Sequence, residues 1–461
     1  MLLAHHHQNS VHLLAVGALL CVCISKADAS GFYLIDQSVS NMGTAYAGGA
    51  AMAEDVGTIY FNPAGLTRLQ QGQFIGGLNF ILTPESEYHD RGSTHLLLGQ
   101  GVLGSDEGGN GGVSGLVPNF YVSKPLSDSL AFGLGVNAPF GLATEYNQDW
   151  IGRYHAVKSE LKTININPAL AFKVNERMSL GFGINYQYIE AEISNAIDIG
   201  TLNALPAAAG GFGGSFNALG LLPAASDGFV TLDGDDWSWG YNVGVLFEQS
   251  DKTRFGFSYR SKVSHSLQGD ADFTIPGGGV IEAGTGLFGD AGVRSSVALP
   301  AIASASVWHA LDSNWTLMAD ISWTEWSNIY ELRFDFDSAQ PDGVTSYQWR
   351  NTRRYAIGAS YTSTGELSYR AGIAFDETPI PNPQLRNPRL PGEDRTWVAV
   401  GLGYRFSSQL SLDVAYAHLF AKGPVIQKTA TGEDALLGGL NGTYEASGNT
   451  ISLQFKWDFS R

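Results

Sequence analysis

The chain has 461 residues, of which 44% are hydrophobic and 57 are glycine, and its formal net charge at pH 7 is -17. Such an acidic chain is a poor partner for nucleic acid, because its charge repels the phosphate backbone. After residue 29 no apolar run is long enough for a membrane-spanning helix, and the nearest rival, residues 205–225, is interrupted by glycine and proline.

Residues 1–29 have the features of a secretory signal peptide. A mostly apolar stretch is followed by small residues typical of a cleavage site at positions 27–29. Both cysteines of the chain, Cys21 and Cys23, lie in this segment. The mature chain is therefore expected to be exported and to contain no disulfide.

Residues 30–71 differ in composition from everything that follows. Glycine, alanine and serine dominate, and apolar and polar residues do not alternate. We expect a compact segment that precedes the sheet rather than a part of it.

Residues 72–461 show repeated strand-like alternation. In the last strand, from Ile451 to Phe459, every second residue is apolar, and the residues between them include Lys456 and Asp458. Successive side chains of a strand point to opposite faces, so one face is apolar and the other is polar or charged. Trp and Tyr often stand at the ends of the apolar face, as in the aromatic girdles of membrane barrels. The clearest such segments are residues 180–188, 239–248, 255–260, 315–324, 367–376 and 451–459.

Short polar turns alternate with long connections along this region. The short turns are predicted at residues 127–128, 175–177, 251–253, 312–314, 365–366 and 408–409, and the long connections at 84–115, 141–160, 200–228, 276–295, 337–343, 381–393 and 431–442. This arrangement predicts an all-β fold, an antiparallel transmembrane barrel of about fourteen strands in an outer membrane of the Gram-negative type. A barrel of that size has a wide lumen. Residues 30–71 are long enough to fill it, which favours a plugged transporter.

Several motifs resemble those of the FadL-type outer-membrane transporters of long-chain fatty acids, a family that includes importers of monoaromatic hydrocarbons. The motifs are Ser30-Gly31-Phe32-Tyr33-Leu34, Asn41-Met42-Gly43, Ala53-Glu54-Asp55, Asn62-Pro63-Ala64, Gly152-Arg153-Tyr154-His155-Ala156, Phe375-Asp376-Glu377-Thr378-Pro379, Pro388-Arg389-Leu390-Pro391 and Asp394-Arg395. The resemblance implies that residues 30–71 form a plug, or hatch, that carries the Asn62, Pro63 and Ala64 motif, and it makes Phe32 a candidate ligand contact.

The resemblance also implies the mode of action. A hydrophobic molecule is captured among extracellular loops, passes to a pocket in the lumen, and leaves sideways through the wall beside a kinked third strand. Uptake is passive, no cofactor or metal is expected, and the partners are the ligand, outer-membrane lipid and lipopolysaccharide. The protein is expected to be a monomer and not an enzyme.

Exposed apolar residues gather in one glycine-rich connection. They are Phe212, Phe216, Leu219, Leu221 and Leu222. Large exposed apolar patches usually mark binding, so this cluster is a candidate for the first capture groove. The alternative is a loop that packs on the barrel rim.

Arg350 and Arg354 have the parity of the lumen side of the tenth strand. The resemblance places a basic residue that binds the ligand head group at Arg350, and a carboxylate would pair well with a guanidinium there. The alternative is a lumenal ion pair or a contact with the plug. The second basic head-group position of the family falls near Asn195, and this departure keeps a neutral aromatic substrate open.

The third strand is expected to end at Pro139. Proline cannot donate to a strand ladder and is confined to edges or bulges. With Ala138 before it and Gly141 after it, Pro139 is a candidate for the kink that opens the wall, or else an ordinary start of a loop.

Other function classes have less support in the residues. Asp233, Asp235 and Asp236 could bind a hard cation, although isolated acidic loops are usually only solvated. A barrel hydrolase would need a Ser-His-Asp arrangement, and none is identifiable. A general porin would have an open lumen and would conduct ions steadily.

Overall fold

The computed structural model describes residues 31–100, 107–363, 365–421 and 423–459. The predicted signal peptide, with both cysteines, lies outside these ranges. Within them, no helix is both long enough and apolar enough to cross a membrane.

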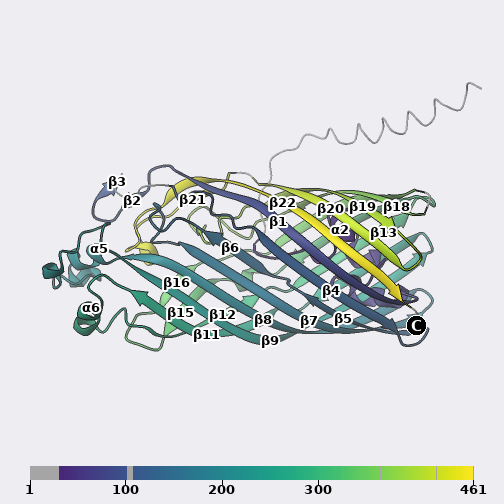
Figure 1. Ribbon diagram of the computed structural model, residues 1–461, viewed down its shortest axis with the longest axis horizontal. Coiled ribbons are helices and arrows are strands. Elements are labelled where there is room, and N and C mark those ends of the chain that lie inside the picture. The colour runs from purple at the N-terminus through teal and green to yellow at the C-terminus, as the bar shows by residue number, and fades with distance from the viewer. Residues whose placement is uncertain (1–30, 101–106, 364, 422, 460–461) are drawn as a thin grey trace, which may run out of the picture.

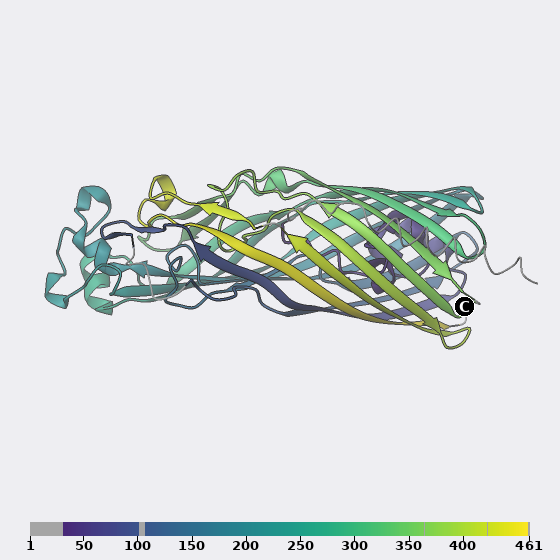
Figure 2. The same cartoon turned by 90° about the horizontal axis from the view of Figure 1, so that it is seen from above.

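The described strands form a closed antiparallel barrel of fourteen wall strands, which confirms the predicted fold class (Figures 1 and 2). The first wall strand, β1 (Gly72–Asp90), pairs with the last, β22 (Asn441–Phe459), and this pairing closes the sheet. The other wall strands are β4 (Gly115–Pro125), β5 (Leu130–Asn137) continued by β6 (Gly141–Glu145), β7 (Lys158–Asn175), β8 (Met178–Asp198), β9 (Asp227–Ser250), β10 (Thr253–Arg260) continued by β11 (Val263–Thr274), β12 (Ala291–Leu299) continued by β13 (Ile302–Ala310), β14 (Trp315–Thr324) continued by β15 (Glu331–Phe336), β16 (Gly343–Ser346) continued by β17 (Thr352–Thr362), β18 (Leu367–Asp376), β19 (Arg395–Arg405), and β20 (Leu410–Ala421) continued by β21 (Val425–Gln427).

The wall shows the alternation that the sequence predicts. On β8, Leu180 and Phe182 are exposed on the outer surface, while Gly181 and Asn185 face inward and are buried. The strands are longer than expected, because β1 runs to Asp90 and parts of the predicted connections are strand. Above the level of the lipid the outward face no longer needs apolar residues, so the alternation that marks a membrane strand fades there.

Residues 31–71 form short helices that lie inside the barrel near the end with the short turns (Figures 1 and 2, purple). Tyr46 and its neighbours pack on Met318 and Trp397 of the wall. We call residues 31–71 the N-terminal segment. Its helices are α2 (Val39–Met42), α3 (Gly49–Met52), α4 (Thr58–Phe61) and η1 (Pro63–Arg68).

Glycines of the wall bring the N-terminal segment close to the strands. At Gly256 and Gly372 a Cβ atom would overlap the backbone of Ala50 and Thr44. These positions need glycine because the backbone of the N-terminal segment occupies the space that a side chain would take. We call the set the glycine seats, and it comprises Gly181, Gly244, Gly256, Gly358 and Gly372.

The third wall strand is broken between β5 and β6. The ladder between β4 and β5 ends at the pair Phe120 and Val136, although β4 remains paired with β1 as far as Gly115. An isolated bridge between Gly112 and Thr144 is the next described contact across this side. Residues 115–119 therefore face a gap in the wall, which we call the wall gap.

The connections at the other end form a cap of loops and short helices, which we call the crown. It comprises the described parts of residues 91–114, 199–226, 275–290 and 428–440 and includes β2 (Thr94–His95), β3 (Gly99–Gln100), α5 (Ile199–Ala204), η2 (Ala207–Ala209), η3 (Asn217–Leu219), α6 (Gly278–Thr285) and η5 (Gly432–Asp434). A further turn, η4 (Trp326–Asn328), links β14 to β15. The labelled helices α5 and α6 mark the tip of the crown in Figure 1.

Candidate ligand-binding site

An apolar cavity lies inside the upper barrel, beneath the crown. It contains about 1050 Å³ of empty space, including its open mouth. Its lining is largely aliphatic and aromatic and includes Phe32, Leu142, Leu161, Ile189, Leu232, Leu267, Val293, Val297, Ile329, Tyr347, Trp349 and Leu390.

One guanidinium faces this cavity. Arg389, in the connection between β18 and β19, is buried, and burial lowers its pKa to about 10. Its Nη1 atom donates to the Lys158 and Ser194 carbonyl oxygens and to Ser159 Oγ, and its Nη2 atom donates to Asn195 Oδ1 at 3.0 Å. Among the described residues no carboxylate pairs with it. A buried cation without a counter-ion is costly and favours an anionic ligand.

Two further polar groups of the lining have no described partner. They are the indole N–H of Trp349 and the hydroxyl of Ser295. Trp349 belongs to a cluster of edge-to-face rings with Phe32 and Trp326, whose centroids lie 5.1–5.9 Å apart. The site thus offers a large apolar volume with a few polar groups, the usual composition of a ligand pocket.

The N-terminal segment takes the place of the missing strand partner at the wall gap. Leu34 N donates to the Pro139 carbonyl oxygen at 2.9 Å, and Gly141 N donates to the Phe32 carbonyl oxygen at 3.1 Å. Gln37 Nε2 donates to the Ala138 carbonyl oxygen at 2.8 Å. Pro139 lacks an N–H group, so the break falls where the ladder would lose a donor anyway. Phe32 therefore connects the cavity to the wall gap.

Residues 20–459 match the family described as "Outer membrane protein transport protein (OMPP1/FadL/TodX)". The chain belongs to this family. Outer membrane protein P1 of Haemophilus influenzae is 30% identical over 97% of this chain and 98% of its own length. A long-chain fatty acid transport protein of Escherichia coli is 29% identical over 88% of this chain and 90% of its own. The crystal structure of a Pseudomonas aeruginosa FadL homologue superposes with a TM-score of 0.83, at 26% identity, covering 93% of this chain and all of the other.

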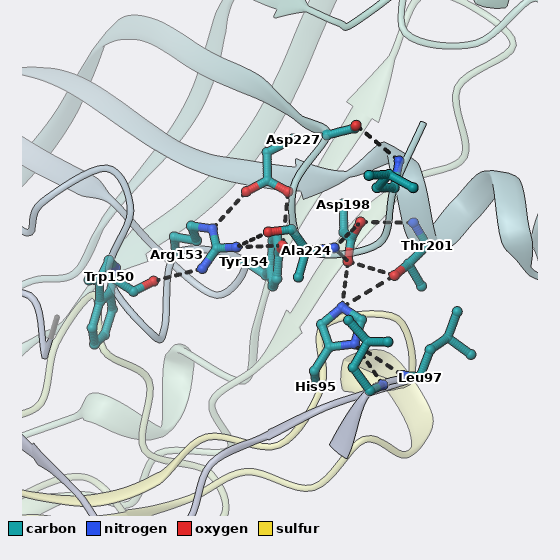
Figure 3. Close-up of polar contacts among 12 residues, drawn as sticks. His95, Leu97, Trp150, Arg153, Tyr154, Asp198, Thr201, Ala224 and Asp227 are labelled. Atoms are coloured by element: carbon teal, nitrogen blue, oxygen red, sulfur yellow. Dashed lines mark hydrogen bonds and ion pairs between the residues drawn. The ribbon is translucent and has the colours of Figure 1, made fainter. Parts of the chain in front are cut away.

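As a member of the OMPP1/FadL/TodX family, the protein is a transport protein of the outer membrane and not an enzyme. The described residues contain one constellation that looks catalytic, in the crown (Figure 3). His95 Nε2 lies 2.6 Å from Asp198 Oδ2, and Thr201 Oγ1 lies 3.2 Å from the same nitrogen.

The hydrogen bonds of this group show a structural role, in which it holds the loops of the crown together. His95 Nδ1 accepts hydrogen bonds from the Leu97 and Leu98 amides, which leaves the proton on Nε2, where it is donated to Asp198. His95 therefore cannot take a proton from Thr201. Asp198 also caps α5 by accepting from the Thr201 amide. In Figure 3 the neighbouring pair of Arg153 and Asp227, joined at 2.7 Å, braces the crown in the same way.

The two arginines predicted to bind the head group do not line this cavity. Arg350 is exposed, and its Nε atom donates to the Thr378 carbonyl oxygen. Arg354 is buried, donates to the Ala45 carbonyl oxygen, and lies near the ring of Tyr46 in the N-terminal segment. Trp349, which directly precedes Arg350, lines the cavity instead.

The predicted loop cluster lies at the tip of the crown and does not line the cavity. Phe212 and Phe216 meet edge to face at 5.4 Å, and Gly284 of α6 lies against Phe216. Leu219 and Leu222 are exposed. The cluster is thus partly covered by α6 and partly open, and its role in capture stays a prediction.

The Asn62 motif ties the N-terminal segment together. Asn62 caps η1 by accepting from the Ala64 amide, with Pro63 in the first turn. Its Nδ2 atom donates to the carbonyl oxygens of Ala50 and of Val245 in β9. One side chain therefore joins two helices to the wall.

The acidic residues considered for calcium do not converge. Asp236 faces inward and pairs with His265 at 3.0 Å, while Asp233 and Asp235 are exposed. In the part of the chain that the structure describes, no cluster of His, Cys, Asp and Glu could hold a metal ion.

Proposed function

We propose that this protein takes up long-chain fatty acids, with the alkyl chain in the apolar cavity and the carboxylate at Arg389. The observation that carries this proposal is a buried guanidinium, without a described counter-ion, on the wall of a largely apolar cavity, whose lining also includes Glu160, Asp233 and Glu331. The Trp349 indole N–H supports it as a second donor.

The physical chemistry of a fatty acid fits a site with an apolar cavity for the alkyl chain and a cation for the carboxylate. Each methylene group moved out of water gains about 0.8 kcal/mol, so a long alkyl chain has a strong preference for the cavity. A charge-assisted hydrogen bond at Arg389 would contribute about 1.5–3 kcal/mol more and would orient the chain. Arg389 takes the role that the resemblance gave to a basic residue near Asn195, since its Nη2 atom lies 3.0 Å from Asn195 Oδ1.

The path around this cavity is part of the proposal. The exposed residues Phe212, Phe216, Leu219 and Leu222 would capture the ligand, and the N-terminal segment would act as the hatch that closes the lumen. The exit would be the wall gap at residues 138–141, where the contacts of Phe32 and Leu34 with the third strand would have to open. A lateral exit spares the alkyl chain a return to water.

A substitution at Arg389 tests the head-group contact. In Arg389→Gln, palmitate should bind the solubilised protein about tenfold to a hundredfold more weakly, while methyl palmitate, which has no charge, should bind as before. Arg350→Gln is the matched control, because it removes an equal charge outside the cavity. A thermal melt shows whether Arg389→Gln still folds. Equal losses for both ligands would mean that Arg389 only holds the loop.

The ring cluster of Phe32, Trp326 and Trp349 favours a second candidate, a monoaromatic hydrocarbon. Toluene needs no cation, so its binding should not respond to Arg389→Gln. If wild-type protein binds toluene but not palmitate, the monoaromatic substrate replaces the fatty acid. Large, steady ion conductance in planar bilayers would instead indicate a general porin without a functioning hatch.

A further inference from the structure

A second, smaller cavity lies deeper in the barrel than the ligand cavity. It contains about 340 Å³ of empty space and is lined by Tyr33, Tyr60, Asn242, Ser258 and Arg260. Arg260 ends β10, and the strand continues upward as β11, whose Leu267 lines the upper cavity. Consecutive residues of the N-terminal segment line the two cavities, Phe32 the upper one and Tyr33 the lower.

Arg260 is a second buried guanidinium without an ion pair among the described residues. Its Nη1 atom donates to Asn185 Oδ1, and its Nη2 atom donates to the Tyr60 carbonyl oxygen at 3.1 Å. The guanidinium carbon lies 4.4 Å from the centre of the Tyr60 ring. Neutral acceptors and a ring compensate a buried cation only in part, so an anion in the lower cavity would be stabilised.

A stripe of asparagines connects Arg260 to the wall gap. Asn165 Nδ2 donates to Asn185 Oδ1 at 3.1 Å and to Asn137 Oδ1 at 3.2 Å. Asn137 is the last residue of β5, next to the kink at Ala138. The stripe thus crosses the inner wall from β10 to the broken third strand.

The end of this stripe at the wall gap has hydrogen-bonding groups that the described protein does not use. Asn165 Oδ1 is buried and has no described partner, and Asn137 Nδ2 is buried with only the Tyr121 hydroxyl beside it as an acceptor. An unpaired buried polar group is destabilising, because it has lost its hydrogen bonds to water. The amide of Asn137 is a donor suited to a carboxylate that has reached the gap.

We infer that Arg260 and the asparagines 185, 165 and 137 form a transit site for the carboxylate of the ligand between the upper cavity and the wall gap. This inference rests on the proposed uptake of fatty acids. The head group moves from Arg389 to Arg260 and then along the amides, while the alkyl chain stays among apolar side chains. Arg260 and the Asn137 amide can donate to the carboxylate at the two ends of the stripe. Between them, the Nδ2 atoms of Asn185 and Asn165 can donate to it by leaving their present asparagine acceptors, so the carboxylate does not cross a purely apolar interior.

The test compares transport with binding. In cells that lack their own fatty-acid transporter, Arg260→Gln should slow palmitate uptake about tenfold and leave methyl palmitate uptake unchanged. The affinity of the purified variant for palmitate should stay at the wild-type value, because the upper cavity is intact. Asn137→Leu, which keeps the volume but removes the amide, should slow palmitate uptake in the same selective way and does not depend on Arg260 variants folding.

Arg254→Gln is the matched control on the same strand. Arg254 is also buried and lumenal, but it lies six positions nearer the short turns and stacks on Trp308 at 3.6 Å. Its uptake of both ligands should equal that of wild type. Equal slowing of both ligands by Arg260→Gln, or undiminished palmitate uptake, would overturn the transit site alone. Wild-type protein that transports no palmitate would overturn the proposed function, and the transit site with it.

Discussion

His155 lies between β6 and β7, beside the crown, and its burial is expected to make this part of the protein sensitive to acid. Burial, together with the positive charges of Lys428 and Arg389, lowers the pKa of His155 to about 3. The nearest carboxylate oxygen, Asp434 Oδ1, is 3.7 Å from Nδ1, too far for a hydrogen bond. The folded crown therefore holds this imidazole neutral.

We expect the crown to lose stability as the pH falls from 7 to 5. The unfolded imidazole has a pKa near 6.5, so below that pH the unfolded state binds the extra proton, and stability falls by up to about 1.4 kcal/mol per pH unit. Limited proteolysis of the crown at the two pH values measures this effect. The variant His155→Gln should show a smaller change.

A second titrating group near His155 acts in the opposite direction. Burial raises the pKa of Asp434, so its protonation in acid favours the folded state. The double variant with Asp434→Asn separates the two contributions. An acid response that survives in His155→Gln and disappears in Asp434→Asn would contradict the assignment to His155.

At this scale the sequence predicts residue types better than residue positions. It marked Asn195 as a missing cation and Pro388-Arg389-Leu390-Pro391 as a motif. Asn195 lies on β8 and the motif in the connection between β18 and β19, and only the folded chain shows that Arg389 reaches Asn195. Arg350 has the parity of the lumen, yet it precedes β17, where the strand geometry behind that parity does not yet apply. Parity places side chains only within a regular strand.

The third wall strand is interrupted between Asn137 and Gly141, on either side of Pro139, and the proposed exit lies at this break. Tyr33 and Phe140 form an antiparallel bridge across the wall gap. Opposed residues of such a bridge have Cα atoms about 4.5–5.5 Å apart, within the range that a disulfide spans.

A double variant, Tyr33→Cys with Phe140→Cys, should lock this bridge. If the N-terminal segment must leave the third strand to release ligand, oxidised cells should take up little palmitate, and a reductant should restore uptake. Thr316→Cys with Ser360→Cys, opposed residues of β14 and β17, is the control pair away from the gap. Full transport in the oxidised Tyr33 and Phe140 variant would exclude an exit at this position.

The strands themselves were largely predictable, because a lipid-facing wall imposes strict alternation. Leu180, Phe182 and Ile184 show it clearly, and the short turns at the closed end were marked by polar residues. The upper ends were not predictable in the same way. Glu190 and Asp235 continue β8 and β9 beyond the lipid, where water accepts any polar side chain and the pattern carries no information about strand length.

At the scale of the whole molecule, the N-terminal segment and the barrel are complementary. The inward wall carries polar side chains such as Asn79 and Gln454, which contact the segment and would be acceptable to water in its absence. The wall strands pair with one another, and their ladders do not depend on the segment.

Deletion of residues 30–71 should therefore leave a folded barrel that leaks small solutes. Swelling of liposomes in an isotonic sugar solution measures the leak, and heat-modifiable migration on a gel checks that the barrel is folded. The intact protein is the control and should be nearly impermeable. A folded, truncated barrel that stays as tight as the intact protein would show that the segment is not the hatch.

The glycine seats have a mechanical consequence. Backbone lies directly on backbone at positions such as Gly256 and Gly372, so the body of the segment cannot slide without the ring of strands widening. Only its leading end, from Gly31 to Leu34, is held by a few hydrogen bonds at the broken strand. If the segment is the hatch, we expect its body to withstand an osmotic pressure difference while its leading end opens by thermal motion. Uptake would then follow the concentration gradient of the ligand and would need no energy source to remove the segment from the barrel.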